Sequence, residues 1–238
     1  MLPKIDVPSY DIVLPVSKTK VTFRPFLVKE QKILLMAMES EETDFITTNI
    51  KQILSNCSLT ELNVDSLPLV DIEFYFLNLR AKSVGEEIES RYKCENIVDE
   101  KKCDNVMDVK YNVLDVDIKV PEGDNIIKLA EDIGIKMKYP SFAVLDKLKS
   151  KAEISEIAFE LIAECVEYIY DKDNIYYQNE IPKEELEAFL DQMTTEQFEQ
   201  VQKFIEDLPK IEKTIEVKCS KCGFEHKIVS KELTDFFS

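Results

Sequence analysis

The sequence feature that most constrains this chain is a Cys-x-x-Cys-Gly motif near its end, running from Cys219 to Gly223 between two alternating apolar stretches. In such a turn both thiolates can face one metal ion at about 2.3 Å, and a glycine after the second cysteine allows a positive φ. Two thiolates fill only half of a tetrahedral zinc site. The chain must therefore supply two further ligands from elsewhere.

The further ligands that we expect are Cys94 and Cys103, at the tip of a predicted upstream hairpin. Eight residues separate these two cysteines, whereas the pairs of zinc ribbons are typically about two to four residues apart. A site formed by Cys94, Cys103, Cys219 and Cys222 would join the middle of the chain to its end. We predict a structural zinc site, because four thiolates leave no open position for catalysis.

Two other interpretations of the four cysteines stay open. They could be small buried hydrophobic residues, or two of them could form a redox pair. The single histidine, His226, could replace one sulfur as a ligand, although the alternation along its strand favours a surface position. Cys57 and Cys165 fall within predicted helices, and we expect both in the core.

Charge and the absence of membrane and signal patterns lead us to expect a cytosolic protein, and the charge is compatible with docking on a less acidic protein. The chain has 47 acidic against 30 basic residues and a net charge of −17, so its field repels phosphate backbones and anionic membranes. It contains neither a run of 18 apolar residues nor a signal-peptide pattern. We therefore expect no nucleic-acid or membrane partner, and the reduced thiols of the cytosol favour metal over disulfides.

Motifs for catalysis are missing from the sequence. With four glycines, the chain has no Gly-rich phosphate loop or dinucleotide fingerprint. A Ser-His-Asp or Cys-His arrangement would have to use His226, next to the proposed metal site. We therefore expect neither enzymatic activity nor a small-molecule substrate. A zinc-containing enzyme or regulator remains the alternative from a different class.

The hydrophobic periodicity predicts an α+β fold, in which antiparallel hairpins are joined by the four-Cys zinc site and packed with a mainly helical segment. Helical segments are expected at about 28–82 and 141–209. The β-rich, metal-clipped unit is expected at about 85–138 plus 211–230. Because the two hairpins flank the second helical segment in sequence, we expect a single interleaved domain over 1–238.

Several individual elements follow from the same patterns. Residues 106–118 should form one long strand, and residues 126–138 should pair with that hairpin. A strong amphipathic helix is predicted over 154–169, and residues 171–180 are predicted to form a loop. Thr194 and Gln197 have the spacing of a capping box at the start of another helix.

The chain ends in an amphipathic stretch with two adjacent aromatic residues, Phe236 and Phe237. They could plug the protein's own core or insert into a partner as an anchor. We keep both as candidate partner-binding residues.

Two groups of residues together resemble a known family. They are the two Cys pairs, in Tyr92 to Cys103 and Lys218 to His226, and the opening phrases Pro8 to Pro15 and Phe23 to Lys32. The combination is similar to the T-even-type myophage baseplate hub and hub-assembly protein family, over nearly the whole chain.

This resemblance implies a component or assembly factor of the contractile-tail baseplate hub that binds hub or tape-measure proteins. It implies a location in the virion's tail baseplate, and in the host cytoplasm during assembly. An assembly chaperone that binds a tail protein and is absent from the mature virion is the alternative.

Overall fold

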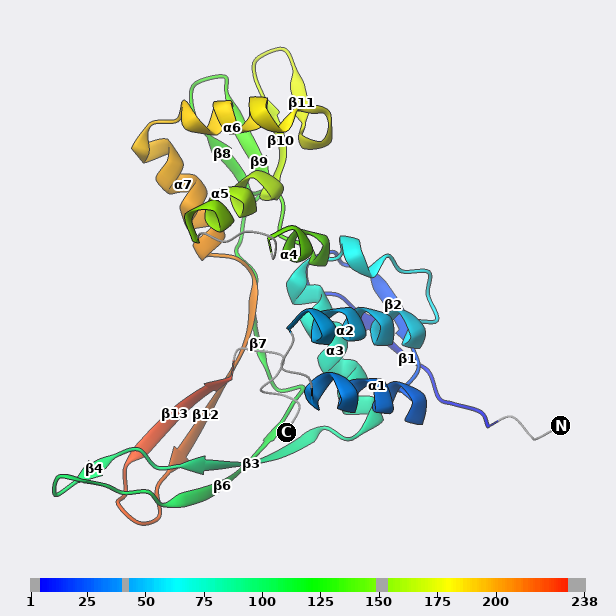
Figure 1. Ribbon diagram of the computed structural model, residues 1–238, viewed down its shortest axis with the longest axis vertical. Coiled ribbons are helices and arrows are strands. Elements are labelled where there is room, and N and C mark those ends of the chain that lie inside the picture. The colour runs from blue at the N-terminus through cyan, green and yellow to red at the C-terminus, as the bar shows by residue number, and fades with distance from the viewer. Residues whose placement is uncertain (1–4, 40–42, 149–153, 231–238) are drawn as a thin grey trace. The chain divides into compact units, whose positions relative to one another are not determined.

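The computed structural model describes residues 5–39, 43–148 and 154–230, whose helices and strands are coloured along the chain in Figure 1. Among these residues every pair of neighbouring strands is antiparallel. The predicted α+β class with antiparallel hairpin sheets is therefore confirmed. Within the same ranges, no helix combines the length and the apolar character needed to cross a membrane.

The chain divides into two compact units, each built from segments that are distant in sequence. Unit 1 draws its described residues from Met1–Val64, Val70–Lys119 and Lys210–Ser238, and unit 2 from Asp65–Leu69 and Val120–Pro209. The single interleaved domain over 1–238 stays a prediction, because it concerns whether both units unfold together.

Unit 1 begins with a short hairpin that packs on helices. Its first elements are β1 (Tyr10–Val13), β2 (Lys20–Phe23), α1 (Val28–Glu39), α2 (Thr43–Cys57) and, but for its first residue, α3 (Leu69–Ser83). The short helix η1 (Val64–Ser66) begins in unit 1 and has its last two residues in unit 2. Phe23 of β2, Leu54 of α2 and Tyr75 of α3 are fully buried. The rings of Phe23 and Tyr75 lie 5.4 Å apart, and the Tyr75 hydroxyl donates to the Leu54 carbonyl at 3.2 Å. These contacts hold the hairpin and two helices in one core.

A buried ion pair fixes the start of α1. The Glu30 carboxylate accepts from the Leu27 backbone N–H at 2.9 Å, as a residue in a first helical turn can. Its other oxygen accepts from Arg24 Nη2 at 3.0 Å, and the same nitrogen donates to the Asn56 carbonyl at 3.0 Å. Arg24 therefore ties the beginning of α1 to the end of α2.

The β-rich part of unit 1 consists of two long hairpins. The strands are β3 (Glu87–Lys93), β4 (Ile97–Val98), β5 (Lys101–Lys102), β6 (Val106–Asn112), β7 (Asp117–Lys119), β12 (Lys210–Lys218) and β13 (Glu225–Ser230). β3 pairs with β6, and β4 pairs with β5 at the tip of that hairpin. β12 pairs with β13 on one side and with β7 on the other.

The predicted continuous strand over 106–118 is wrong, because the chain turns after Asn112. The Asn112 side chain accepts from the Leu114 N–H at 2.8 Å, and its carbonyl accepts from the Asp115 N–H at 3.2 Å. An asparagine that bonds the backbone two residues on is a common turn former. The strand that follows, β7, then pairs with β12 instead of β3.

Unit 2 is a four-stranded antiparallel sheet with helices. Its elements are β8 (Ile126–Lys128), β9 (Gly134–Met137), α4 (Phe142–Leu148), α5 (Ile154–Cys165), β10 (Val166–Tyr170), β11 (Ile175–Tyr177), η2 (Gln178–Glu180), α6 (Lys183–Asp191) and α7 (Thr195–Glu206). The strand order is β11-β10-β9-β8. The predicted capping box of α7 is confirmed, with reciprocal bonds between Thr194 and Gln197.

Two predictions about unit 2 are wrong. Residues 126–138 contain β8 and β9, which pair with each other, and β9 pairs with β10 and not with the upstream hairpin. The predicted helix over 154–169 ends at Cys165, and β10 follows it directly. In a regular strand, residues three apart face opposite sides of the sheet. An irregularity between Val166 and Tyr168 allows both Val166 and Ile169 to be buried. This spacing of apolar residues is also that of a helix, which explains the wrong prediction.

The predicted loop over 171–180 also contains structure. β11 lies within it and pairs with β10, and η2 follows. Its three side chains are all exposed, so no burial pattern marked it as a strand.

Candidate metal centre

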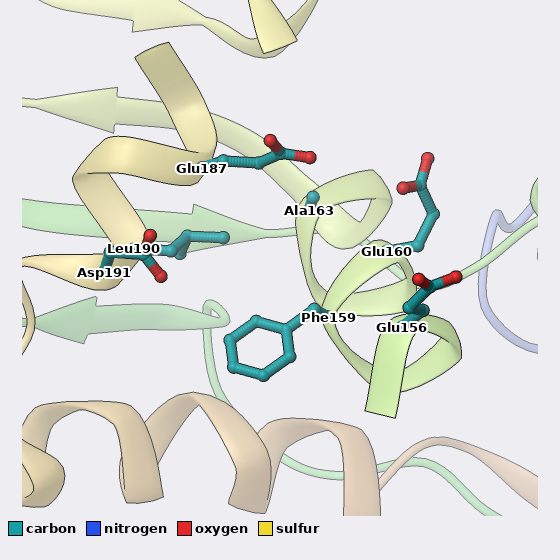
Figure 2. Close-up of a pocket in the computed structure, with 7 residues that line it drawn as sticks. All are labelled: Glu156, Phe159, Glu160, Ala163, Glu187, Leu190 and Asp191. Carbon is teal, nitrogen blue, oxygen red and sulfur yellow. The ribbon is translucent and has the colours of Figure 1, made fainter. Parts of the chain in front are cut away.

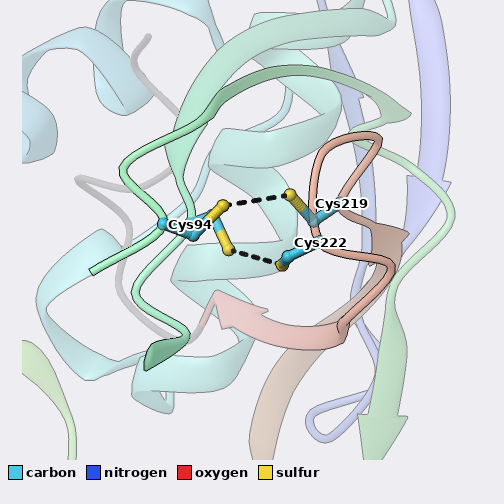
Figure 3. A group of neighbouring side chains, drawn as sticks. Cys94, Cys219 and Cys222 are labelled. Carbon is cyan, nitrogen blue, oxygen red and sulfur yellow. Dashed lines mark hydrogen bonds between the residues drawn. The ribbon is translucent and has the colours of Figure 1, made fainter. Parts of the chain in front are cut away.

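The tips of the two long hairpins of unit 1 bring four cysteines together. Cys94 and Cys103 lie between β3 and β6, and Cys219 and Cys222 lie in the turn between β12 and β13. Their four Sγ atoms all lie within 4.8 Å of one another. Figure 3 shows Cys94 facing Cys219 and Cys222 from the opposite hairpin. The structure thus places all four predicted ligands in one cluster.

The small β4–β5 hairpin explains the wide spacing of the first pair. Asp99 and Glu100 both have positive φ, at 49° and 61°, which gives a tight two-residue turn. The Cys103 N–H donates to the Asn96 carbonyl and the Cys94 N–H to the Asn105 carbonyl, each at 2.8 Å. The intervening residues therefore loop out, and both cysteines face the same way.

The second pair sits in the compact turn that the motif predicts. Gly223 has a φ of 73°, a conformation that costs glycine little and other residues more. Its N–H donates to the Cys219 carbonyl at 2.9 Å, and the Cys219 N–H donates to the Phe224 carbonyl at 2.8 Å. The predicted role of Gly223 is confirmed.

The sulfur separations suit a tetrahedral thiolate site. Cys94 and Cys222 have their Sγ atoms 3.6 Å apart, and Cys103 and Cys219 have theirs 3.8 Å apart. With zinc–sulfur bonds of about 2.3 Å, the edge of a regular tetrahedron of sulfurs is about 3.8 Å. A disulfide needs about 2.05 Å, and all four thiols are free. The four sulfurs could thus hold one zinc ion with small movements.

Three side-chain nitrogens lie against the sulfurs from outside the cluster. Asn96 Nδ2 donates to Cys222 Sγ and Asn105 Nδ2 donates to Cys219 Sγ, each at 3.6 Å. His226 Nε2 lies 3.1 Å from Cys94 Sγ. The asparagine amides are hydrogen-bond donors, and His226 would be one in the tautomer that carries a proton on Nε2. Such donors stabilise negative charge on thiolates, and four thiolates around one Zn²⁺ would leave an excess of negative charge.

The two asparagines were not predicted as part of the site, although a sequence pattern marks them. Each follows a cysteine by two residues, in Cys94-Glu-Asn96 and Cys103-Asp-Asn105. Each reaches a sulfur of the opposite hairpin. The repeated triplet of Cys, an acidic residue and Asn could have indicated both asparagines from the sequence.

The expected surface position of His226 is wrong. The residue is 7% exposed, and its ring lies 5.3 Å from that of Tyr92 and 4.8 Å from that of Phe224. The alternation along β13 was misleading, because the loop of the other hairpin covers this end of the strand. Cys57 and Cys165 are buried away from the cluster, so the prediction that they are core residues is confirmed.

Backbone dipoles favour the thiolate at the Cys-x-x-Cys turn. N–H groups of Cys222 and Lys221 lower the pKa of Cys219 to about 6, and the Phe224 N–H lowers the pKa of Cys222. Burial raises the pKa of Cys94. The turn thus presents metal-binding sulfur at neutral pH, whereas Cys94 depends on nearby positive charge to ionise.

Sequence comparison assigns the chain to a known group of proteins. A family model described as T4 bacteriophage base plate protein matches residues 7–238. The chain belongs to this base plate family. The Baseplate hub assembly protein gp26 of Enterobacteria phage T4 is 24% identical to it over 229 residues, which are 96% of this chain and 97% of that protein. No solved structure matches the chain.

The family resemblance that we drew from the Cys pairs and the opening phrases is therefore confirmed. One of those phrases, Phe23 to Lys32, contains Arg24 and Glu30, whose ion pair secures α1 in this base plate protein. The other candidate residues, Phe236 and Phe237, lie outside the described residues. Their role as a plug or an anchor stays a prediction.

Proposed function

We propose that this base plate family member is a baseplate hub component or hub-assembly protein that acts by binding hub or tape-measure proteins. The observation that carries the proposal is the end-to-end similarity to a protein named for baseplate hub assembly. The similarity covers 96% of this chain and 97% of that protein, so it extends over nearly the whole length of both sequences. The proposed locations are the tail baseplate and, during assembly, the host cytoplasm.

Binding without catalysis is the mode of action that we infer. The four-thiolate cluster, once it holds zinc through Cys94, Cys103, Cys219 and Cys222, has no open coordination position. The net charge of −17 opposes nucleic acid and anionic membranes. We accordingly propose partners that are proteins, and neither a small-molecule substrate nor a lipid surface.

The proposed zinc is structural. It would clip the tip of the β3–β6 hairpin to the β12–β13 turn, which joins segments 116 residues apart between Cys103 and Cys219. Such a site contributes its binding energy to folding, because the unfolded chain does not hold the four ligands together. The two asparagine donors, Asn96 and Asn105, favour a thiolate site over a cluster of four small hydrophobic side chains, since an apolar cluster has no use for such donors.

Quantitative mass spectrometry of purified virions and of infected-cell lysate tests the function. The signal is normalised to a known central hub protein. A small-integer ratio in virions identifies a hub subunit, whereas abundance in lysate with absence from virions identifies an assembly chaperone that is released. An unchanged yield of complete baseplates from a phage lacking this gene would overturn both.

A further inference from the structure

Unit 2 contains a pocket between α5 and α6 that is separate from the cysteine cluster (Figure 2). Its volume is about 420 Å³. Figure 2 shows Glu187, Leu190 and Asp191 on α6 opposite Phe159 and Ala163 on α5. The pocket combines apolar and acidic side chains, and this pairing indicates what it could bind.

The apolar part of the pocket leaves an aromatic ring open to solvent. Phe159 is 48% exposed, although one side of its ring stacks on Phe198 with centroids 5.3 Å apart. Ala163 and Leu190 lie buried in the pocket wall. Covering a half-exposed phenylalanine and its apolar surroundings with another apolar side chain is favourable.

Carboxylates surround this apolar surface. Glu160 is paired with Lys183 at 2.6 Å, and Glu187 lies 3.8 Å from the same lysine. Within the part of the chain that the structure describes, no salt bridge engages Glu156 or Asp191, which are both exposed. These two carboxylates are free to meet a cation from another molecule.

Unit 2 as a whole is negatively charged, like the pocket. The segments of unit 2 contain 22 Asp and Glu against 9 Lys, a net charge of −13 out of the −17 of the chain. This field attracts basic partners and repels anionic ligands and a second copy of the same unit. Charge complementarity therefore selects one kind of occupant.

We propose that the α5–α6 pocket docks a basic segment of a partner protein. An apolar side chain of that segment packs against Phe159 and Leu190, and Lys or Arg residues flanking it pair with Glu156 and Asp191. The inference rests on the proposed function, whose partner chemistry it specifies. Protein interfaces commonly combine a buried apolar anchor with charged residues at the rim. The anchor contributes most of the affinity, and the charges set the orientation and raise the association rate.

A fluorescent amphipathic peptide with Leu on one face and Lys on the other is the probe. Its binding to the full-length protein is measured by anisotropy and compared with a Lys→Glu version and a Leu→Ala version. We expect the Leu/Lys peptide to bind, and neither the Lys→Glu version nor the Leu→Ala version. Binding weakens as salt rises above about 0.1 M, where the Debye length falls below about 10 Å.

Matched charge variants locate the binding. Glu156→Lys with Asp191→Lys is compared with Glu131→Lys with Glu206→Lys, which makes the same change in net charge at exposed positions of unit 2 outside the pocket. We expect the pocket variant to lose about tenfold in affinity and the control to stay close to the wild type. Phe159→Ala, checked for an unchanged circular dichroism spectrum, should also weaken binding. Equal weakening by both charge variants, or no binding at all, would overturn the proposal.

Complementation of a phage lacking this gene separates the inference from the proposed function. Wild-type protein and the control variant should restore baseplate assembly, and the pocket variant should not. If the pocket variant restores assembly as well as the control does, the pocket proposal fails and the assembly role stands. If assembly proceeds without any added protein, the assembly role itself fails.

Discussion

The Nε2 atom of His226 lies 3.1 Å from the Sγ atom of Cys94, and both side chains are buried. The two residues are 132 positions apart, so the contact joins β13 to the loop between β3 and β6. Tyr92 and Phe224 flank the imidazole. A nitrogen held this close to a sulfur stabilises the thiolate without having to bind the metal itself.

We predict that His226→Phe retains about one zinc per chain but releases it to a chelator about tenfold faster, because outer donors tune metal affinity. Phenylalanine keeps the ring packing and removes the nitrogen. His226→Gln, which can restore a donor, should recover part of the loss. In the cobalt-substituted protein, His226→Phe should leave the thiolate charge-transfer bands unchanged. A change from the wild-type bands would instead make His226 a ligand.

Loss of one cluster thiolate should destabilise unit 1. Cys219→Ser is expected to lose the metal and to lower the free energy of unfolding by about 3 kcal/mol or more, since metal binding is coupled to folding. Hydrogen exchange should speed up in β3, β6, β12 and β13. Cys57→Ala, which changes a buried thiol outside the cluster, serves as the control and should retain about one zinc. A metal-free wild-type protein with unchanged stability in chelator would contradict the zinc proposal.

The parts of the fold that the sequence predicted well depend on local interactions. The Cys-x-x-Cys turn with Gly223 and the capping box of Thr194 and Gln197 each involve residues that are close in sequence. The first helical segment, expected at about 28–82 from apolar spacing, contains α1, α2 and α3. The four members of the cysteine cluster could also be predicted, because the spacing of Cys219 and Cys222 favours a metal site that needs two further ligands.

The predictions failed where the structure depends on which distant segment a residue pairs with or is covered by. The alternation of apolar residues correctly predicted strands within 126–138. Their partner β10 was predicted as helix instead, because the spacing of Val166 and Ile169 fits a helical period. The irregularity in β10 that produces this spacing depends on pairing with β9, which sequence periodicity does not reveal. His226 was misplaced for a similar reason, since its cover comes from a loop more than 120 residues away.

The Arg24–Glu30 ion pair gives a third prediction. Glu30 is fully buried and accepts from both Arg24 and the Leu27 N–H. Removing one member of a buried pair leaves the other charge uncompensated. Glu30→Ala should therefore cost about 3 kcal/mol of unfolding free energy. Glu30→Gln keeps acceptor geometry and should cost less, and thermal denaturation of both variants measures the difference. Equal stability of wild type and Glu30→Ala would show that the pair contributes nothing.

The same pair predicts a loss of stability in acid. Burial alone would raise the pKa of Glu30, but the hydrogen bonds from Arg24 and Leu27 outweigh it and lower the pKa below the ordinary 4.5. A carboxyl with a depressed folded-state pKa stabilises the fold above its unfolded pKa, and the contribution disappears as pH falls through the folded value. The wild type should thus lose more stability than Glu30→Gln when the pH is lowered below 4.5.

Glu73 on α3 gives a prediction of opposite sign. Burial raises its pKa from 4.5 to about 7. Below pH 4.5 the carboxyl is protonated in both the folded and the unfolded state, so it does not affect the free energy of unfolding. Between 4.5 and about 7 the unfolded chain ionises first, and the free energy of unfolding falls as pH rises. The full effect is about 3 kcal/mol, from about 1.4 kcal/mol per pKa unit.

Glu73→Gln removes this titration and should make unfolding less dependent on pH. We expect denaturant unfolding to show the variant gaining stability relative to the wild type as pH rises from 4.5 to 7, with no further gain above that value. The exposed Glu61 provides the control, because Glu61→Gln should follow the wild-type curve. Parallel curves for the wild type and Glu73→Gln would mean that Glu73 ionises equally easily in both states, and that its burial on α3 carries no electrostatic cost.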